Sequence, residues 1–125
     1  MLISIGDVDR ASLRSLVEIF YRDAREDPLL GPVFERHVVN WDEHLARMTD
    51  FWSSLLLREN SYSGHPFELH RAIPGLTKPM FDRWVEIFAA AAQEQFGNTA
   101  AAKVLTDHAK RMGIQLGRAT IGVAP

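Results

Sequence analysis

Four polar or titratable side chains stand in apolar stretches of this sequence, and their types could support chemistry. Tyr21, His44 and His70 each have hydrophobic neighbours at helical spacing, and Trp84 brings an indole N–H that needs a partner when it is buried. A polar group on the apolar side of a helix is costly unless it is paired. These four positions are therefore the first candidates for a functional site.

His70 is the candidate metal ligand. It follows Leu69, and Phe67 and Ile73 stand three residues to either side. A neutral imidazole can give one nitrogen to a metal while a backbone carbonyl holds the other N–H. A histidine on an apolar face is more often a satisfied core residue, so this spacing leaves both interpretations open.

His44 stands at the head of an amphipathic helical face. Apolar residues follow it at helical spacing: Met48, Phe51, Trp52 and Leu55. Such a face suits a flat apolar ligand, with His44 at one edge and Arg47 placed to pair with a carboxylate at the rim. An ordinary amphipathic helix with a half-exposed His44 explains the same pattern. Tyr21 is likewise explained as a boundary residue whose hydroxyl reaches water.

Motifs of other catalytic sites are absent from the sequence. A carboxylate-bridged di-iron bundle needs a glutamate three residues before a histidine on two helices, and none of the 5 histidines has one. The chain contains no His-Glu-x-x-His, no Gly-x-x-x-x-Gly-Lys and no Gly-x-Ser-x-Gly. It also contains no cysteine, which excludes disulfides, thiolate metal sites and cysteine nucleophiles.

Length and composition predict one globular domain over residues 1–125. The chain is 46% hydrophobic and 24% charged, with a net charge of −2. Its 14 basic residues are scattered, so nucleic acid and anionic membranes are not expected as partners. We expect a cytoplasmic protein, because no secretory signal and no apolar run of about 20 residues is found. We expect a monomer, since no exposed heptad or large apolar patch is found.

Helical periodicity and capping residues predict an all-α chain. Asp7 and Thr77 are the expected N-caps of two helices, and Gly97 is an expected C-terminal stop. No segment alternates as a strand would. The predicted elements are a helix from Asp7 to about Arg25, a short helical turn within 28–39, a helix from Asn40 (with Glu43 in capping-box position) to about Arg58, a loop over 59–64, a short helix from Pro66 to Pro74, a helix from Thr77 to Phe96, and a helix from about Asn98 to Leu116.

The order of these signals is more specific than any one of them. In chain order they are Phe20-Tyr21, Asp-Pro-Leu-Leu-Gly-Pro-Val-Phe at 27–34, Trp-Asp-Glu-His at 41–44, Met48, Phe51-Trp52, Tyr62-Ser-Gly-His-Pro66, His70, and Phe81-Asp-Arg-Trp84 followed by Phe88. This series resembles the truncated haemoglobins, and among them the third group. The resemblance covers about residues 7–117. The chain lacks the paired-glycine motifs of the first two groups, as the third group does.

The resemblance implies a fold, a cofactor and a set of site residues. The fold is a truncated globin, a two-over-two helical sandwich around haem b. His70 corresponds to the proximal iron ligand, Tyr21, His44 and Trp84 to distal polar positions, and Phe34 to an aromatic that packs on the haem. Arg47 corresponds to a partner of a haem propionate. The remaining matches are wall positions: Phe20, Met48, Phe51, Trp52, Leu69, Ile73 and Phe81.

The resemblance also implies reversible binding of oxygen, nitric oxide, carbon monoxide or other diatomic molecules. Each hydrogen bond to a charged group contributes about 1.5–3 kcal/mol, so three candidate donors favour slow release. Oxygen or nitric oxide chemistry, peroxide turnover or sensing is therefore expected rather than bulk oxygen transport, with a reductase as a possible partner. The alternatives are a haem-free globin-like interaction domain and a metal-dependent hydrolase.

Overall fold

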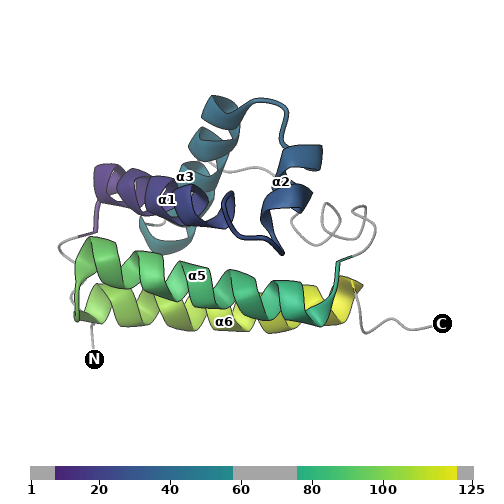
Figure 1. Cartoon of the computed structure of the whole chain (residues 1–125). Helices are drawn as coiled ribbons and strands as arrows, with labels where there is room; N and C mark the ends of the chain where they lie inside the picture. Colours follow the sequence, from purple (N-terminus) through teal and green to yellow (C-terminus); the bar gives the residue numbers. More distant parts are fainter. Residues whose placement is uncertain (1–7, 58–75, 121–125) are drawn as a thin grey trace.

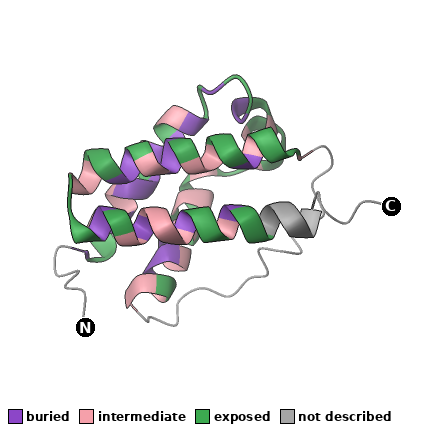
Figure 2. Cartoon of the chain, turned by 90° about the horizontal axis from the view of Figure 1, so that it is seen from below, coloured by how far each residue is buried: buried purple, intermediate pink, exposed green. Residues whose placement is uncertain are grey.

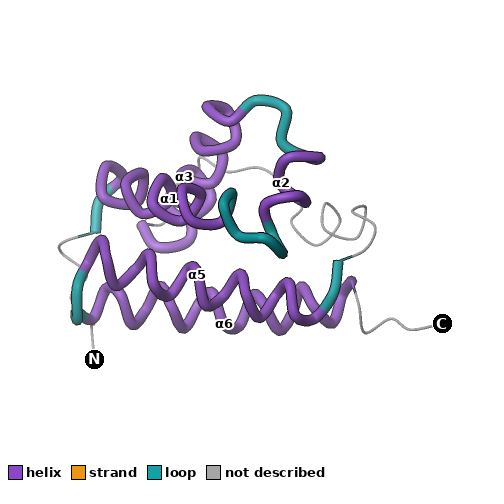
Figure 3. Tube along the Cα trace, in the orientation of Figure 1, coloured by secondary structure: helices purple, strands orange, loops and turns teal. Residues whose placement is uncertain are grey.

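The structure is a computed structural model that describes residues 8–57 and 76–120, with side chains described as far as residue 115. All regular secondary structure in these ranges is helical (Figure 3). The helices are α1 (Arg10–Ala24), α2 (Gly31–His37), α3 (Trp41–Leu57), α5 (Lys78–Phe96) and α6 (Ala100–Thr120).

The helices form two layers (Figure 1). α5 and α6 run antiparallel as one pair, α1 lies along α5, and α3 packs against α1. The short α2 stands at the corner between α1 and α3. This confirms the all-α, two-over-two fold expected from the sequence. No helix in the described part of the chain combines the length and the hydropathy needed to cross a membrane.

The core is built from the buried faces of α1, α3, α5 and α6 (Figure 2). On α1 the buried residues Leu13, Leu16, Val17 and Phe20 recur at the spacing of a single helical face. α5 and α6, which contact each other, also carry small buried residues: Ala91, Ala92, Ala101, Ala102 and Ala109. Small side chains let neighbouring helix backbones approach closely.

Gly113 shows how close α5 and α6 come. A Cβ atom built on Gly113 would lie 2.9 Å from Cγ2 of Val85. That distance is shorter than ordinary carbon–carbon contact, so a larger residue at position 113 would push the helices apart or displace Val85.

The start of α1 corrects a sequence prediction. The N-cap is Asp9, not Asp7: the Asp9 carboxylate accepts a hydrogen bond from the Ser12 N–H at 2.7 Å, and Ser12 Oγ accepts one from the Asp9 N–H at 2.9 Å. This reciprocal box needs an acceptor side chain three residues after the cap. Asp9 has Ser12 there, whereas Asp7, which lies outside the described residues, has Arg10.

Other helix boundaries agree with the sequence in part. Asn40 Oδ1 accepts a hydrogen bond from the Glu43 N–H, as expected at the start of α3. Thr77 is the N-cap of α5, but its side chain makes no capping hydrogen bond. Gly97 follows α5 with φ +67°, a conformation that favours glycine.

The bounds of α6 differ from the prediction of Asn98 to Leu116. The helix begins at Ala100, because Thr99 Oγ1 accepts a hydrogen bond from the Ala102 N–H and takes the capping role. The helix continues past Gly117 to Thr120, since a glycine inside a helix weakens the helix by about 1 kcal/mol without ending it. The predicted loop over 59–64 and the predicted helix from Pro66 to Pro74 lie outside the described residues.

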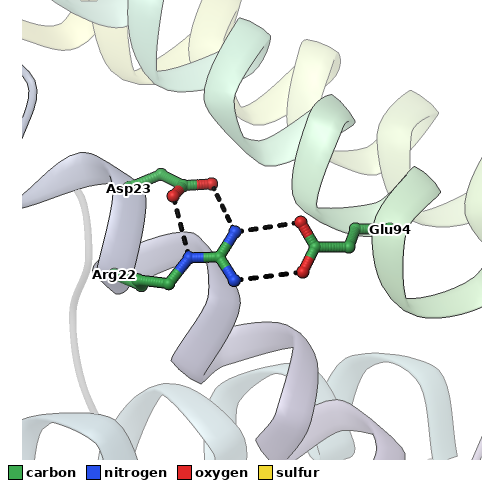
Figure 4. A network of polar contacts seen from close by, with 3 residues as sticks. All are labelled: Arg22, Asp23 and Glu94. Carbon is green, nitrogen blue, oxygen red and sulfur yellow. Dashed lines mark hydrogen bonds and ion pairs between the residues drawn. The ribbon is translucent and has the colours of Figure 1, made fainter.

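An ionic cluster joins α1 to α5 at the surface (Figure 4). The Arg22 guanidinium donates to both Glu94 carboxylate oxygens, at 2.9 and 3.1 Å, and to Asp23 on its own helix. All three side chains are largely exposed to solvent. Exposed ion pairs contribute little to stability, so the buried apolar faces hold these helices together.

Candidate functional site

A hydrogen bond between Tyr21 and His44 lies at the centre of the candidate site. The Tyr21 hydroxyl oxygen and His44 Nε2 are 2.8 Å apart, although the residues are 23 positions apart in the sequence. Tyr21 continues the buried face of α1, and His44 lies one turn into α3. The interpretation of Tyr21 as a residue with its hydroxyl in water is therefore wrong, because only 7% of Tyr21 is exposed.

Burial favours the uncharged form of both members of this pair. It raises the pKa of Tyr21 far above its ordinary value of 10.0, so the phenol stays protonated. Burial, followed by the positive charge of Arg47, lowers the pKa of His44 below 6.5. A neutral imidazole and a phenol share one hydrogen bond, and when His44 is the donor, the Tyr21 O–H remains available to a third group.

Aromatic rings enclose the pair on the side of α2. Phe34 packs edge-on against Tyr21, with ring centroids 5.3 Å apart. The ring of Trp41 lies 5.4 Å from Tyr21 and 5.7 Å from His44. The sequence pattern placed Trp41 in a motif but did not assign it to the site. Its position three residues before His44, on the same face of a helix, is the signal that would have found it.

Trp84 belongs to a neighbouring aromatic stack. Its ring lies nearly parallel to Phe88, at 5.7 Å, and Phe88 stacks in turn on Trp52 at 4.8 Å. Phe20 links this stack to the polar pair, because it contacts both Trp84 and Tyr21. No ring contact joins Trp84 directly to Tyr21 or His44 in the described ranges.

The predicted wall residues fall into two groups. Phe20, Trp52 and Phe81 are buried in the core. Phe34, Met48 and Phe51 are half-buried and leave apolar surface along α2 and α3, while Arg47 is exposed. The half-buried residues are the ones that a flat apolar ligand would cover.

His70, Leu69 and Ile73 lie outside the described residues, so their predicted roles are not tested. Within residues 8–57 and 76–115, no group of three or more histidine, aspartate or glutamate side chains is arranged to hold a metal ion. The assignment of His70 as an iron ligand stays a prediction.

The relatives of this chain decide its family. No protein-family model matches the chain. A group 3 truncated haemoglobin from Campylobacter jejuni subsp. jejuni serotype O:2 is 34% identical to it over an alignment of 85 residues. The match covers 65% of this chain and 67% of that protein. The chain belongs to the group 3 truncated haemoglobins.

A solved structure extends this likeness to the whole fold. The crystal structure of the group III truncated haemoglobin from Campylobacter jejuni is similar with a TM-score of 0.87 and 26% sequence identity. The similarity covers 94% of this chain and 95% of that one. The resemblance inferred from the order of sequence signals is thereby confirmed.

In this truncated haemoglobin, a buried carboxylate fixes the corner that leads to Phe34. Asp27 accepts hydrogen bonds from the backbone N–H groups of Leu29 and Leu30, both at 3.0 Å, and from Arg83 Nε at 2.7 Å. Burial acts to raise the pKa of Asp27, but these hydrogen bonds outweigh it and lower the pKa below 3.8.

Arg83 precedes Trp84 on α5, so this ion pair ties the corner to the helix that carries the aromatic stack. The sequence analysis placed Asp27 in the motif of residues 27–34 but gave its side chain no role. An aspartate followed by backbone N–H groups two and three residues later is the turn signal that indicates such a role.

Proposed function

We propose that this truncated haemoglobin binds haem b and reversibly binds oxygen, nitric oxide or carbon monoxide beside Tyr21 and His44. The observation that carries the proposal is the buried 2.8 Å hydrogen bond between these two side chains. A protonated phenol and a neutral imidazole, packed among aromatic rings, form a small polar spot in apolar surroundings. That combination suits a small, weakly charged ligand.

The chemistry of the surrounding residues fits a haem. Phe34, Met48 and Phe51 offer half-buried apolar surface for its flat faces, and the exposed guanidinium of Arg47 is free to reach a propionate from the rim. His70 would supply the nitrogen that holds the haem iron. When bound, haem would supply a redox-active iron that can bind a diatomic molecule.

Tyr21 and His44 are proposed to hold the ligand by hydrogen bonding. A hydrogen bond to a group that carries partial charge contributes about 1.5–3 kcal/mol, which corresponds to about a ten- to hundredfold change in affinity. Such donors slow the release of the ligand. This favours oxygen or nitric oxide chemistry, or sensing, over bulk oxygen transport.

Visible absorption spectroscopy tests haem binding directly. The purified protein, with and without added haemin, is expected to give the intense Soret band of a bound haem. The His70→Ala variant should lose this band or shift it, whereas the His108→Ala variant on α6 should match the wild type. A wild-type protein that takes up no haemin would instead indicate a haem-free interaction domain.

Ligand-binding kinetics test which reaction the protein performs with its diatomic ligand. Rates of oxygen and nitric oxide binding and release on the ferrous protein distinguish a carrier, a sensor and a dioxygenase. Slow oxygen release with rapid consumption of nitric oxide supports the dioxygenase, which also needs a reductase to return the iron to the ferrous state. Rapid oxygen release contradicts the role proposed for Tyr21 and His44. A monomer in solution is proposed for this single domain.

A further inference from the structure

We propose that Trp41, held in place by Arg25, is a positioning residue for the Tyr21–His44 pair. The inference rests on the proposed ligand-binding role of that pair. We assign Trp41 no direct contact with the ligand. It acts by packing against both members of the hydrogen bond, where the end of α1 meets the start of α3.

Helical spacing explains why these residues meet. On α3, Trp41 and His44 are three positions apart, and on α1 Tyr21 and the C-cap residue Arg25 are four apart. Residues at these separations share one face of a helix. The two pairs therefore face each other across the junction of α1 and α3.

The contacts of Trp41 restrict both rings of the hydrogen bond. Its ring lies 5.4 Å from Tyr21 with an angle of 63° between the planes, and 5.7 Å from His44 with an angle of 87°. Both arrangements are edge-to-face, the favoured geometry for aromatic pairs. One hydrogen bond alone leaves an imidazole free to tilt about that bond. A ring packed against the side of His44 opposes such tilting.

Arg25 lies over the ring of Trp41. The guanidinium carbon lies 4.1 Å from the centroid of the Trp41 ring, a cation–π contact. Arg25 also pairs with Glu35 on α2 at 3.4 Å. The arginine thus connects α1, α2 and α3 around the indole, and its planar group can stack in a way that a lysine cannot.

A packing role alone would affect stability without changing His44. Trp41 is only half-buried, and the Arg25 side chain is 43% exposed, so neither is a main part of the core. A positioning role predicts in addition that His44 becomes more solvated and that ligand release becomes faster when Trp41 is lost.

The test measures the pKa of His44 by NMR in the full-length protein as purified, using the diamagnetic ferrous carbon monoxide form where haem is bound. In Trp41→Ala the pKa of His44 is expected to rise towards its ordinary value of 6.5. Among the described residues, Arg47 on its own helix acts on the pKa of His44 and Tyr21 on α1 shares a hydrogen bond with it; both remain in this variant, as does Arg25 beside Trp41.

Ligand release provides the second readout. An aromatic pair contributes about 0.5–1.5 kcal/mol, so oxygen dissociation from Trp41→Ala should accelerate about two- to tenfold. Trp41→Phe keeps a ring at this position and should restore most of the wild-type behaviour. An unchanged pKa of His44 together with an unchanged dissociation rate in folded Trp41→Ala overturns the inference.

Arg25→Lys tests the inference if Trp41→Ala does not fold. This variant keeps the positive charge, so a rise in the pKa of His44 reports the lost stacking of Arg25 on Trp41. Arg22→Lys is the matched control, because Arg22 lies on the same helix but pairs with Glu94, and it should leave His44 unchanged. Equal pKa values in the two lysine variants overturn the role of Arg25. Because these NMR measurements do not require haem, they can fail or succeed independently of the proposed function.

Discussion

Tyr21 and His44 owe their expected chemistry to burial. Burial raises the pKa of Tyr21 above its ordinary value and lowers the pKa of His44 below its ordinary value, so it favours the phenol and the neutral imidazole. The sequence identified both residues because polar groups on apolar helical faces are costly. It did not predict their hydrogen bond, since no local pattern relates positions on two different helices.

Removal of the Tyr21 hydroxyl should weaken ligand retention. Tyr21→Phe keeps the ring and its contacts with Phe20 and Phe34, but it removes the phenol from the pair with His44. Oxygen dissociation from the ferrous protein should accelerate by about ten- to hundredfold, corresponding to about 1.5–3 kcal/mol. Stopped-flow measurement of the oxygen dissociation rate checks this prediction, and a rate equal to that of the wild type would contradict it.

His44 should make stability depend on pH in the acidic range. Its pKa in the folded protein is below the ordinary 6.5, so the unfolded chain binds more protons between these two values. Stability therefore rises with pH through this window and falls as the pH drops from neutral. Urea unfolding measures this effect: between about pH 7 and pH 5, the free energy of unfolding should fall less for His44→Gln than for the wild type.

His108 is present in both proteins of that comparison. Burial and then Arg111 also lower its pKa, while Asp107 acts in the opposite direction, so its contribution cancels in the difference. A pH dependence in His44→Gln identical to that of the wild type would contradict the expected state of His44.

At the scale of elements, the corner between α1 and α2 is set by close backbone contact. The Gly31 N–H donates to the Asp27 carbonyl at 2.8 Å, and a Cβ at position 31 would lie 2.5 Å from the Arg25 carbonyl oxygen. Such a contact cannot be relieved by rotating a side chain, because the neighbour is backbone. The sequence predicted only a short helical turn within 28–39, because the close approach depends on how the chain folds around this turn.

Gly31→Ala should therefore destabilise the protein. Overpacking of this kind costs about 1–3 kcal/mol, and chemical denaturation measures it. Arg36→Ala, at an exposed position on α2, is the control and should change stability by less than about 0.5 kcal/mol. Equal stability of Gly31→Ala and the wild type would show that the corner adjusts without strain.

At the scale of the whole molecule, buried apolar contacts outweigh surface ion pairs. Leu105 on α6 is fully buried, with 0% of its surface exposed. Arg22 joins α1 to α5 through exposed contacts with Glu94. Leu105→Ala should cost about 2–5 kcal/mol of unfolding free energy, whereas Arg22→Gln should cost less than about 1 kcal/mol. Thermal or urea unfolding compares them, and a larger effect for Arg22→Gln would contradict this view of the core.

The sequence by itself predicted the helices of the described residues, and its resemblance to a known family implied the two-over-two fold. Apolar residues at helical spacing mark the faces that must be buried, and caps such as Asn40 and Gly97 limit the elements, because both effects act over a few neighbouring residues. Helix boundaries were harder to predict where two residues could act as the N-cap: Asp7 was predicted for α1, whereas Asp9 caps it.

Only the tertiary structure decided which side chains meet. The Tyr21–His44 hydrogen bond, the packing of Trp41 and Arg25 around it, and the pairing of Asp27 with Arg83 each join different helices. Such contacts depend on the angle and distance at which helices cross, and these follow from the packing of the whole core. For the same reason burial, and with it the charge state of His44, belongs to the folded molecule and not to its sequence neighbours.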